Sequence, residues 1–135
     1  MVLNHPCHLQ TYRAGARIAI ADDVGMSGAT ICSTLQITIG ARTMLGANVT
    51  ILDTNFHPLE AEGRRLAPIP EPEPDDAVEI GEDVFIGAGA FVLPGTRIGN
   101  GTVVAAASVV RGDIPAGVVV AGNPARVVKN LSQVD

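Results

Sequence analysis

The chain has 135 residues, of which 47% are hydrophobic and 17% charged, and this balance excludes a disordered chain and predicts one domain with a real core. Its net charge of −5 argues against a protein that binds nucleic acid through phosphate contacts. Cys7 and Cys32 form neither a disulfide framework nor a zinc spacing, and no apolar run approaches the ~18 residues of a membrane span. Because no signal-peptide pattern follows Met1, we expect a cytoplasmic protein.

The first predicted elements are short strands that recur about every six residues from Ile20. Successive blocks open at Ile20, Met26, Cys32, Ile39, Leu45 and Ile51, and the block that begins at Cys32 carries one extra residue. This division into blocks predicts that the Cys32 side chain points into the protein. A period of six fits neither an amphipathic helix nor a strand that ends in hairpins, so it predicts short strands joined by corners in a parallel coil.

Residues 57–79 interrupt the repeat. This segment holds five of the nine prolines and seven acidic residues against Arg64 and Arg65. Alternating Pro and Glu favours an extended, hydrated chain, so we expect a loop extruded from one corner. A long loop of this kind is usually functional or disordered, and the position of His57 at its root favours a functional loop.

The second array is more regular. Six blocks open at aliphatic residues without a slip in phase, and most second and fifth places hold Gly, Ala, Thr, Ser or Val. The opening residues are Ile80, Ile86, Val92, Ile98, Val104 and Val110. Each coil would bury its aliphatic residues against its neighbours, as in a solenoid, and the ends must be capped. We expect a single domain over residues 1–135, with coils over about 8–56 and 80–118 and a C-terminal cap over 119–135.

This hexapeptide pattern resembles that of the acyltransferases with a left-handed parallel β-helix, over roughly residues 8 to 130. In that family three hexapeptides form one triangular coil, so the resemblance implies an all-β fold with four coils, two before residue 57 and two after residue 79. The left hand follows from the resemblance alone, because the general rule for parallel crossovers gives the opposite hand. The resemblance also implies a homotrimer whose active sites lie between neighbouring prisms.

The segment ILDTNFHPLE resembles the DTDFHPL-type segment of sugar and polysaccharide O-acetyltransferases, which are related to the maltose and galactoside acetyltransferases. The resemblance implies that His57 is the general base that removes a proton from a sugar hydroxyl during attack on a thioester, and an imidazole with an ordinary pKa near 6.5 suits that task. The alternative is a histidine hydrogen-bonded to the backbone. Asn55 stands where the family usually has Asp, so Asp53 is the remaining nearby carboxylate; its alternative role is to cap backbone amides at a corner.

Further residues are assigned to an acceptor site by the same resemblance. Ser27, in VGMSGATI, matches a VGISG-like segment, and its alternative role is that of a small corner residue. Phe85 stands where relatives carry an aromatic residue beside the active site, and it could equally pack at a subunit interface. With Asp53 and Asn55, these residues form the predicted acceptor site.

A donor site for acetyl-CoA is implied by the closing segment VVVAGNPARVVK, which resembles an AGNPARV-type signature. The ionised side chains between residues 97 and 129 are four basic ones and Asp113, an excess of three positive charges in an acidic chain. Arg126 and Lys129, with Arg111, are therefore predicted near the phosphates of coenzyme A, whereas Ala88 and Ala106 leave room for the pantetheine arm. The alternative is a solvated cap with ordinary surface charges.

These observations favour an acetyl-CoA-dependent O-acetyltransferase of a saccharide, in polysaccharide or cell-envelope metabolism. Two alternatives stay open: N-acetylation of an amino sugar or acyl transfer to an antibiotic, and a non-catalytic β-helix scaffold. We expect no metal, because His5, His8 and His57 lack the three-His zinc arrangement of the related β-helical carbonic anhydrases. A direct attack on the thioester fits better than an acyl-enzyme, since no motif pairs a Ser or Cys with His57.

Overall fold

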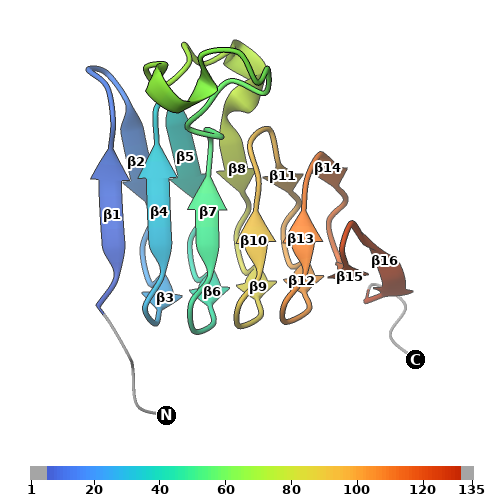
Figure 1. The fold of residues 1–135 in the computed structure, drawn as a ribbon. Helices are drawn as coiled ribbons and strands as arrows, with labels where there is room; N and C mark the ends of the chain where they lie inside the picture. The colour runs from blue at the N-terminus through green and yellow to red at the C-terminus, as the bar shows by residue number, and fades with distance from the viewer. Residues whose placement is uncertain (1–5, 132–135) are drawn as a thin grey trace.

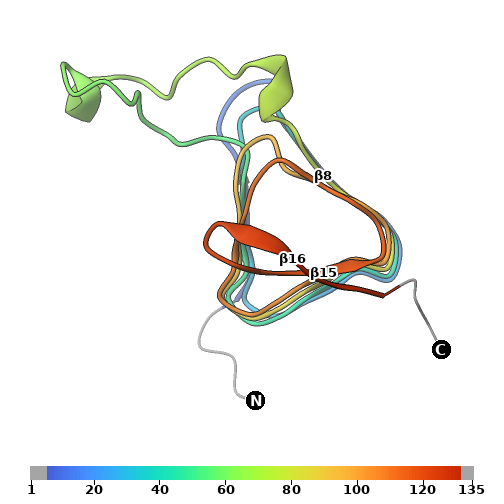
Figure 2. The same cartoon turned by 90° about the vertical axis from the view of Figure 1, so that its right-hand side faces the viewer.

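The computed structural model describes residues 6–131 as a parallel β-helix that is triangular in cross-section (Figures 1 and 2). Three sheets form its sides, and each takes one strand from every coil. Sheet A contains β1 (His8–Thr11), β4 (Thr30–Ser33), β7 (Thr50–Leu52), β10 (Phe91–Val92) and β13 (Val109–Val110). Sheet B contains β2 (Arg17–Ile20), β5 (Gln36–Ile39), β8 (Val78–Ile80), β11 (Arg97–Ile98) and β14 (Asp113–Ile114).

Sheet C forms the third side and carries the closing hairpin. It contains β3 (Gly25–Met26), β6 (Met44–Leu45), β9 (Phe85–Ile86), β12 (Val103–Val104), β15 (Val118–Gly122) and β16 (Ala125–Asn130). All strand pairs are parallel except β15 with β16, which are antiparallel. In Figure 2, β15 and β16 lie across the end of the prism, as expected of a C-terminal cap. Residues 132–135 of the predicted cap lie outside the described residues.

The prism has five coils, whereas the block count predicted four. Each sheet takes five parallel strands from the coils, and the insertion falls inside the third coil, between β7 and β8. The twelve blocks correspond to β2–β13, so the missing coil consists of three strands at the two ends: β1 before the blocks, and β14 and β15 after them. All four residues of β1 are exposed, so this strand has no buried pattern. We name the three corners by the sheets they join: the AB corner (12–16, 34–35, 53–77, 93–96 and 111–112), the BC corner and the CA corner.

The coil is left-handed, as predicted. Sheet A strands run upward on the near face of Figure 1, and the chain then returns down sheet B. Seen from the C-terminal end in Figure 2, the chain therefore turns clockwise while it advances toward the viewer. This sense is opposite to the usual one for parallel crossovers.

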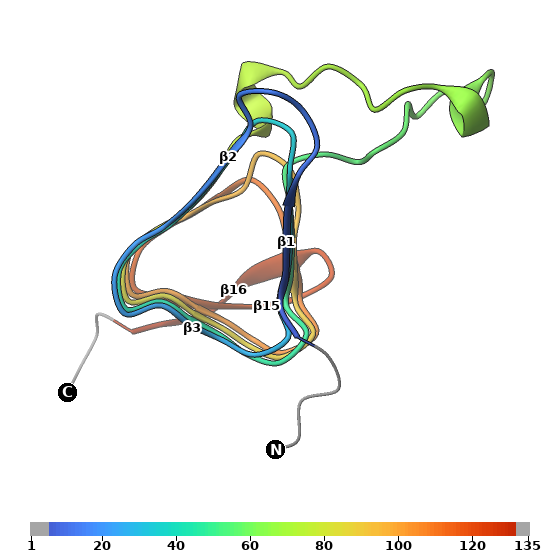
Figure 3. The same ribbon diagram turned by 90° about the vertical axis from the view of Figure 1, so that its left-hand side faces the viewer.

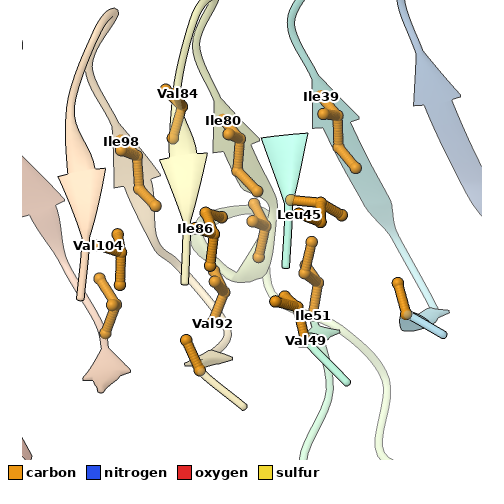
Figure 4. Close-up of a cluster of buried hydrophobic side chains, with 14 of the residues drawn as sticks. Ile39, Leu45, Val49, Ile51, Ile80, Val84, Ile86, Val92, Ile98 and Val104 are labelled. Carbon is orange, nitrogen blue, oxygen red and sulfur yellow. The ribbon is translucent and has the colours of Figure 1, made fainter. Parts of the chain in front are cut away.

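Aliphatic residues in register from coil to coil fill the prism (Figure 4). On sheet A, for example, Ile31, Ile51, Val92 and Val110 are aligned and fully buried. The small residues predicted at the second place have a direct cause: a Cβ atom on Gly87 would lie 2.5 Å from the backbone nitrogen of Ala106 in the next coil.

The register corrects one detail of the sequence division. Ile31, and not Cys32, aligns with Ile51, whereas Cys32 aligns with Leu52. Cys32 is buried, but it alternates with Ile31 along β4 and its Sγ lies 3.6 Å from the hydroxyl of Tyr12. The CA corner before β4 spans residues 27–29, one residue fewer than the corner 46–49 of the next coil, so the inward position falls on Ile31. Because adjacent strand residues face opposite sides, a shift of one residue reversed the side on which Cys32 lies.

The insertion leaves the AB corner and extends beyond sheet A in both end-on views (Figures 2 and 3), as the extruded loop predicted. It contains two short 3-10 helices, η1 (Arg64–Leu66) and η2 (Pro74–Asp76), and otherwise has no regular structure. The rest of the described chain is strand and turn, and it includes no helix with the length and hydropathy needed to cross a membrane.

Candidate functional site

A cleft of about 220 Å³ opens at the AB corner, where the insertion leaves the prism. One wall comes from the chain that follows β7, the other from the returning arm of the insertion. The lining residues are Thr34, Asp53, Thr54, Asn55, His57, Pro58, Leu59, Pro70, Glu71, Pro72, Asp76 and Pro94. The cleft thus combines apolar proline surfaces with three carboxylates, an amide and one imidazole.

His57 lines this cleft and is exposed. Its backbone N–H donates to the carbonyl of Asn55 (2.8 Å), so its main chain is held in a tight turn. Among residues 6–131, neither a side chain nor a backbone group makes a hydrogen bond with its imidazole. The alternative of an imidazole hydrogen-bonded to the backbone therefore does not apply within the described residues. An exposed imidazole without a partner is available to take a proton from a bound molecule.

Asp53 is fully buried and serves as a corner cap. Its carboxylate accepts hydrogen bonds from the Ser33 hydroxyl (2.6 Å) and from the backbone N–H groups of Thr34 (2.7 Å) and Leu35 (3.0 Å). It also receives a longer bond, 3.4 Å, from the Thr34 hydroxyl. Each partner lies in the preceding coil, and none is His57. The structure therefore places Asp53 in its alternative role, as a side chain that closes the turn beneath the cleft.

The turn before His57 includes a feature that the sequence did not reveal. Phe56 has a φ of 64°, in the left-handed region that bulky residues rarely adopt. Together with the bond from the His57 N–H to the Asn55 carbonyl, this makes a γ-turn of the rare, strained kind. The Phe56 N–H donates to the Thr54 hydroxyl (3.0 Å), and its ring meets the ring of Tyr12 edge to face, with centroids 5.2 Å apart.

The returning arm of the insertion is tied to the first coil. Arg13 forms an ion pair with Glu71 across the AB corner, with an N–O distance of 2.5 Å. Both side chains are substantially exposed, so the energy of this pair is small, and it joins the returning arm to the first coil. Sequence reasoning missed Tyr12 and Arg13, because neither lies in a recognisable motif. They contact Phe56 and Glu71, in the walls of this corner, only through the coiling of the chain.

Of the predicted acceptor residues, Asp53 and Asn55 line the cleft, and Ser27 and Phe85 do not. Ser27 lies at the CA corner, where its carbonyl accepts from the Asn48 N–H (3.0 Å). Phe85 lies on the outer face of sheet C, beside Met44 and Val103, and is 42% exposed. Within one chain these two residues are separated from His57 by a side of the prism.

Three of the five predicted donor residues, Ala88, Ala106 and Arg126, lie at or next to the CA corner, whereas Lys129 pairs with Val119 near the other end of sheet C. Ala88 and Ala106 are exposed at successive levels of the CA corner, where the Ala107 N–H donates to the Ala88 carbonyl (2.9 Å). Arg126 and Lys129 project from β16, which starts at this corner, and both are exposed. Arg111 is exposed too, but it lies at the AB corner of the last coil, apart from the others.

The metal prediction concerns three histidines, of which His5 lies outside the described residues. Within residues 6–131, no three His, Cys, Asp or Glu side chains are grouped so that they could hold a metal ion.

Comparisons with known proteins agree with this architecture. Residues 77–112 match the family described as bacterial transferase hexapeptide (six repeats). The chain is 42% identical over 106 residues to the Escherichia coli K12 protein named "Putative lipopolysaccharide biosynthesis O-acetyl transferase WbbJ", a match that covers 76% of this chain and 54% of that protein. The chain therefore spans about half the length of this curated relative.

Two solved structures share the fold. A maltose O-acetyltransferase from Clostridium difficile 630 matches with a TM-score of 0.72 and 36% identity, over 84% of this chain and 59% of that one. A galactoside acetyltransferase in complex with coenzyme A matches with a TM-score of 0.68 and 27% identity, over 93% of this chain and 64% of that one.

Proposed function

The chain belongs to the hexapeptide-repeat acyltransferase family, and from this premise we propose that it transfers an acetyl group from acetyl-CoA to a hydroxyl of a saccharide. Polysaccharide or cell-envelope sugars are the proposed acceptors, and the cytoplasm is the proposed location. The observation that carries the proposal is the exposed His57 imidazole, which lines a cleft at the root of the insertion and has no partner among residues 6–131. The names of the WbbJ relative and of the two solved structures support it.

In the proposed reaction, the acceptor lies in the cleft with its hydroxyl against His57. The imidazole removes the hydroxyl proton while the oxygen attacks the thioester carbonyl carbon of acetyl-CoA. A backbone N–H group would stabilise the negative oxygen of the tetrahedral intermediate. When that intermediate collapses, the carbon–sulfur bond breaks, the acetyl ester remains on the acceptor, and the proton on His57 passes to the departing thiolate. No acyl-enzyme is needed.

The donor residues define the second half of the proposal. Ala88 and Ala106 are small, exposed residues of the CA corner beside which a pantetheine arm could lie, and Arg126 and Lys129 could meet the phosphates of coenzyme A. The relative solved with coenzyme A makes this donor a reasonable choice. Because this corner and His57 lie at different corners of one prism, the complete site would need the cleft of one copy beside the CA corner of another.

A homotrimer would provide such an arrangement, and the outer surfaces of the sheets favour it. Sheets A and C present large apolar side chains outward: Phe91 is 44% exposed, Met44 is 55% exposed, and Phe85 lies beside Met44. Sheet B instead presents the charged residues Glu79, Arg97 and Asp113. Two apolar sides that meet at the CA corner suit packing between copies, and the insertion extends past one of them (Figure 2). Ser27 and Phe85 would then reach the cleft of a neighbour.

The test is thiol release from acetyl-CoA by the purified protein with a panel of neutral mono- and oligosaccharides. We expect release that depends on the acceptor and falls about 10² to 10⁴-fold in His57→Ala. His8→Ala is the matched control, since His8 is an exposed histidine on β1 outside the cleft. Glucosamine, tested beside this panel as an acceptor with an amine, separates ester from amide products. Release that does not depend on an acceptor, or that survives in His57→Ala, would contradict the proposal, and no binding of acetyl-CoA would favour a scaffold.

A further inference from the structure

The strained turn that presents His57 rests against an aromatic residue of the first coil. We propose that Tyr12 is a positioning residue for His57 and acts through Phe56, an inference that rests on the proposed role of His57 as base. Tyr12 does not line the cleft, so it would touch neither substrate. Its effect would pass from its ring to the Phe56 ring, and from the Phe56 backbone to the residue that follows it.

The backbone at Phe56 is strained. A residue with a side chain stays at a φ of 64° only when its surroundings hold it there, and such residues gather at functional sites. Phe56 is the central residue of the γ-turn closed by the His57 N–H, so its φ sets the direction in which the chain enters His57. Because the imidazole has no hydrogen-bond partner among residues 6–131, its position depends mainly on this backbone.

Tyr12 is held by contacts with the second coil as well as by Phe56. Its backbone N–H donates to the Ser33 carbonyl (2.9 Å), and its hydroxyl lies 3.6 Å from the Cys32 Sγ. Its ring stands at 85° to the Phe56 ring, the edge-to-face arrangement that aromatic pairs favour. Tyr12, Cys32 and Phe56 belong to the first, second and third coils, so the contact joins three successive levels of the prism to the turn.

The state of the Tyr12 phenol agrees with a packing role. The contact with the Cys32 thiol, followed by partial burial, raises the pKa of Tyr12 above its usual value. The phenol therefore stays protonated at neutral pH and would not act as a base. What Tyr12 can contribute is the placement of a ring, which Phe would keep and Leu would lose.

The test compares Tyr12→Leu and Tyr12→Phe in the full-length wild-type and His57→Ala backgrounds. We expect Tyr12→Leu to lower kcat about 10 to 100-fold with little change in the KM for acetyl-CoA, because small displacements of a catalytic group are costly. Tyr12→Phe should keep most of the wild-type kcat. In the His57→Ala background Tyr12→Leu should cause no further loss, since a residue that acts through His57 cannot act once His57 is gone.

Two controls separate positioning from loss of fold. Val110→Ala weakens the buried core of the last coil and should lower thermal stability without lowering kcat. Phe56→Gly accepts the left-handed conformation without strain but lacks the ring, so it should fold and still lose kcat. Full activity of Phe56→Gly, or an equal Tyr12→Leu loss in both backgrounds, would overturn the inference.

The outcomes also separate failure of the role of Tyr12 from failure of the proposed function. If the wild-type activity depends on His57 but Tyr12→Leu keeps the wild-type kcat, this inference alone is wrong. If His57→Ala is as active as the wild type, the proposed function fails and the role of Tyr12 fails with it.

Discussion

Replacing Asp53 by Asn tests whether this buried residue closes a turn or takes part in catalysis. The Asp53 carboxylate accepts three short hydrogen bonds, two from backbone N–H groups and one from the Ser33 hydroxyl. An amide keeps one accepting oxygen and turns an NH₂ group toward at least one of these donors, which leaves a buried N–H without an acceptor. Since an unsatisfied buried group costs about 1–3 kcal/mol and bonds to charged groups contribute about 1.5–3 kcal/mol, we expect a loss of roughly 3 kcal/mol.

The assay is chemical and thermal unfolding at a fixed protein concentration. At about 4 °C per kcal/mol for a chain of this size, the melting temperature of Asp53→Asn should fall by roughly 10 °C. Asp113→Asn, an exposed carboxylate on sheet B, should change stability by less than about 0.5 kcal/mol. Well below its melting temperature, Asp53→Asn should keep a kcat within about threefold of wild type, since Asp53 has no contact with His57. Unchanged unfolding together with a collapsed kcat would refute this reasoning.

Further predictions concern packing, charge and assembly. Gly87→Ala should cost about 1–3 kcal/mol in urea unfolding, because its Cβ would meet the next coil at 2.5 Å, whereas Gly25→Ala, which has open space, should be nearly neutral. The Arg42 guanidinium donates a hydrogen bond to Asp83 and lowers the pKa of that carboxyl. The stability that this pair contributes should therefore be complete above about pH 4 and lost as the pH falls further. In Asp83→Asn, the urea midpoint should no longer show the acid dependence that this pair causes. If the site is shared between copies, a mixed assembly of His57→Ala and Ala106→Trp chains, refolded together, should restore thiol release that neither variant shows alone. No restoration would argue for a site within one chain.

The regular part of the fold could be predicted from sequence because each repeat shows the same pattern, an aliphatic residue at every sixth position. From Ile80 to Val110 every opening residue of a block lies in the core or at a buried strand position, in the predicted phase. Prediction failed where that six-residue pattern is weak. The first strand, β1, pairs with a neighbour on one side only, and all four of its residues are exposed, so it has no buried pattern. At β4 the adjacent residues Ile31 and Cys32 are both apolar, so composition could not decide which one faces inward.

The candidate site was only partly predictable, for a different reason. His57 could be located because it stands at the boundary between a repeat and a proline-rich insertion, which is a local feature. The capping role of Asp53 depends on donors from the preceding coil, and a corner Asp looks the same in sequence whatever it binds. The contact between Tyr12 and Phe56 joins residues from the first and third coils, and the local sequence around neither residue indicates this contact.

The position of the insertion explains how one chain can combine a rigid frame with a variable site. Strands β7 and β8 pair with both of their neighbours on sheets A and B, as if residues 53–77 were an ordinary corner. The ladder that stabilises the prism therefore does not depend on the length of this turn, and the entropy cost of a longer loop grows only slowly with length. The AB corner already varies among the coils, from residues 34–35 in the second to residues 12–16 in the first. Under the proposed function, a change of acceptor would thus need changes in the insertion and at this corner, while the repeats keep His57 at the same level of the prism.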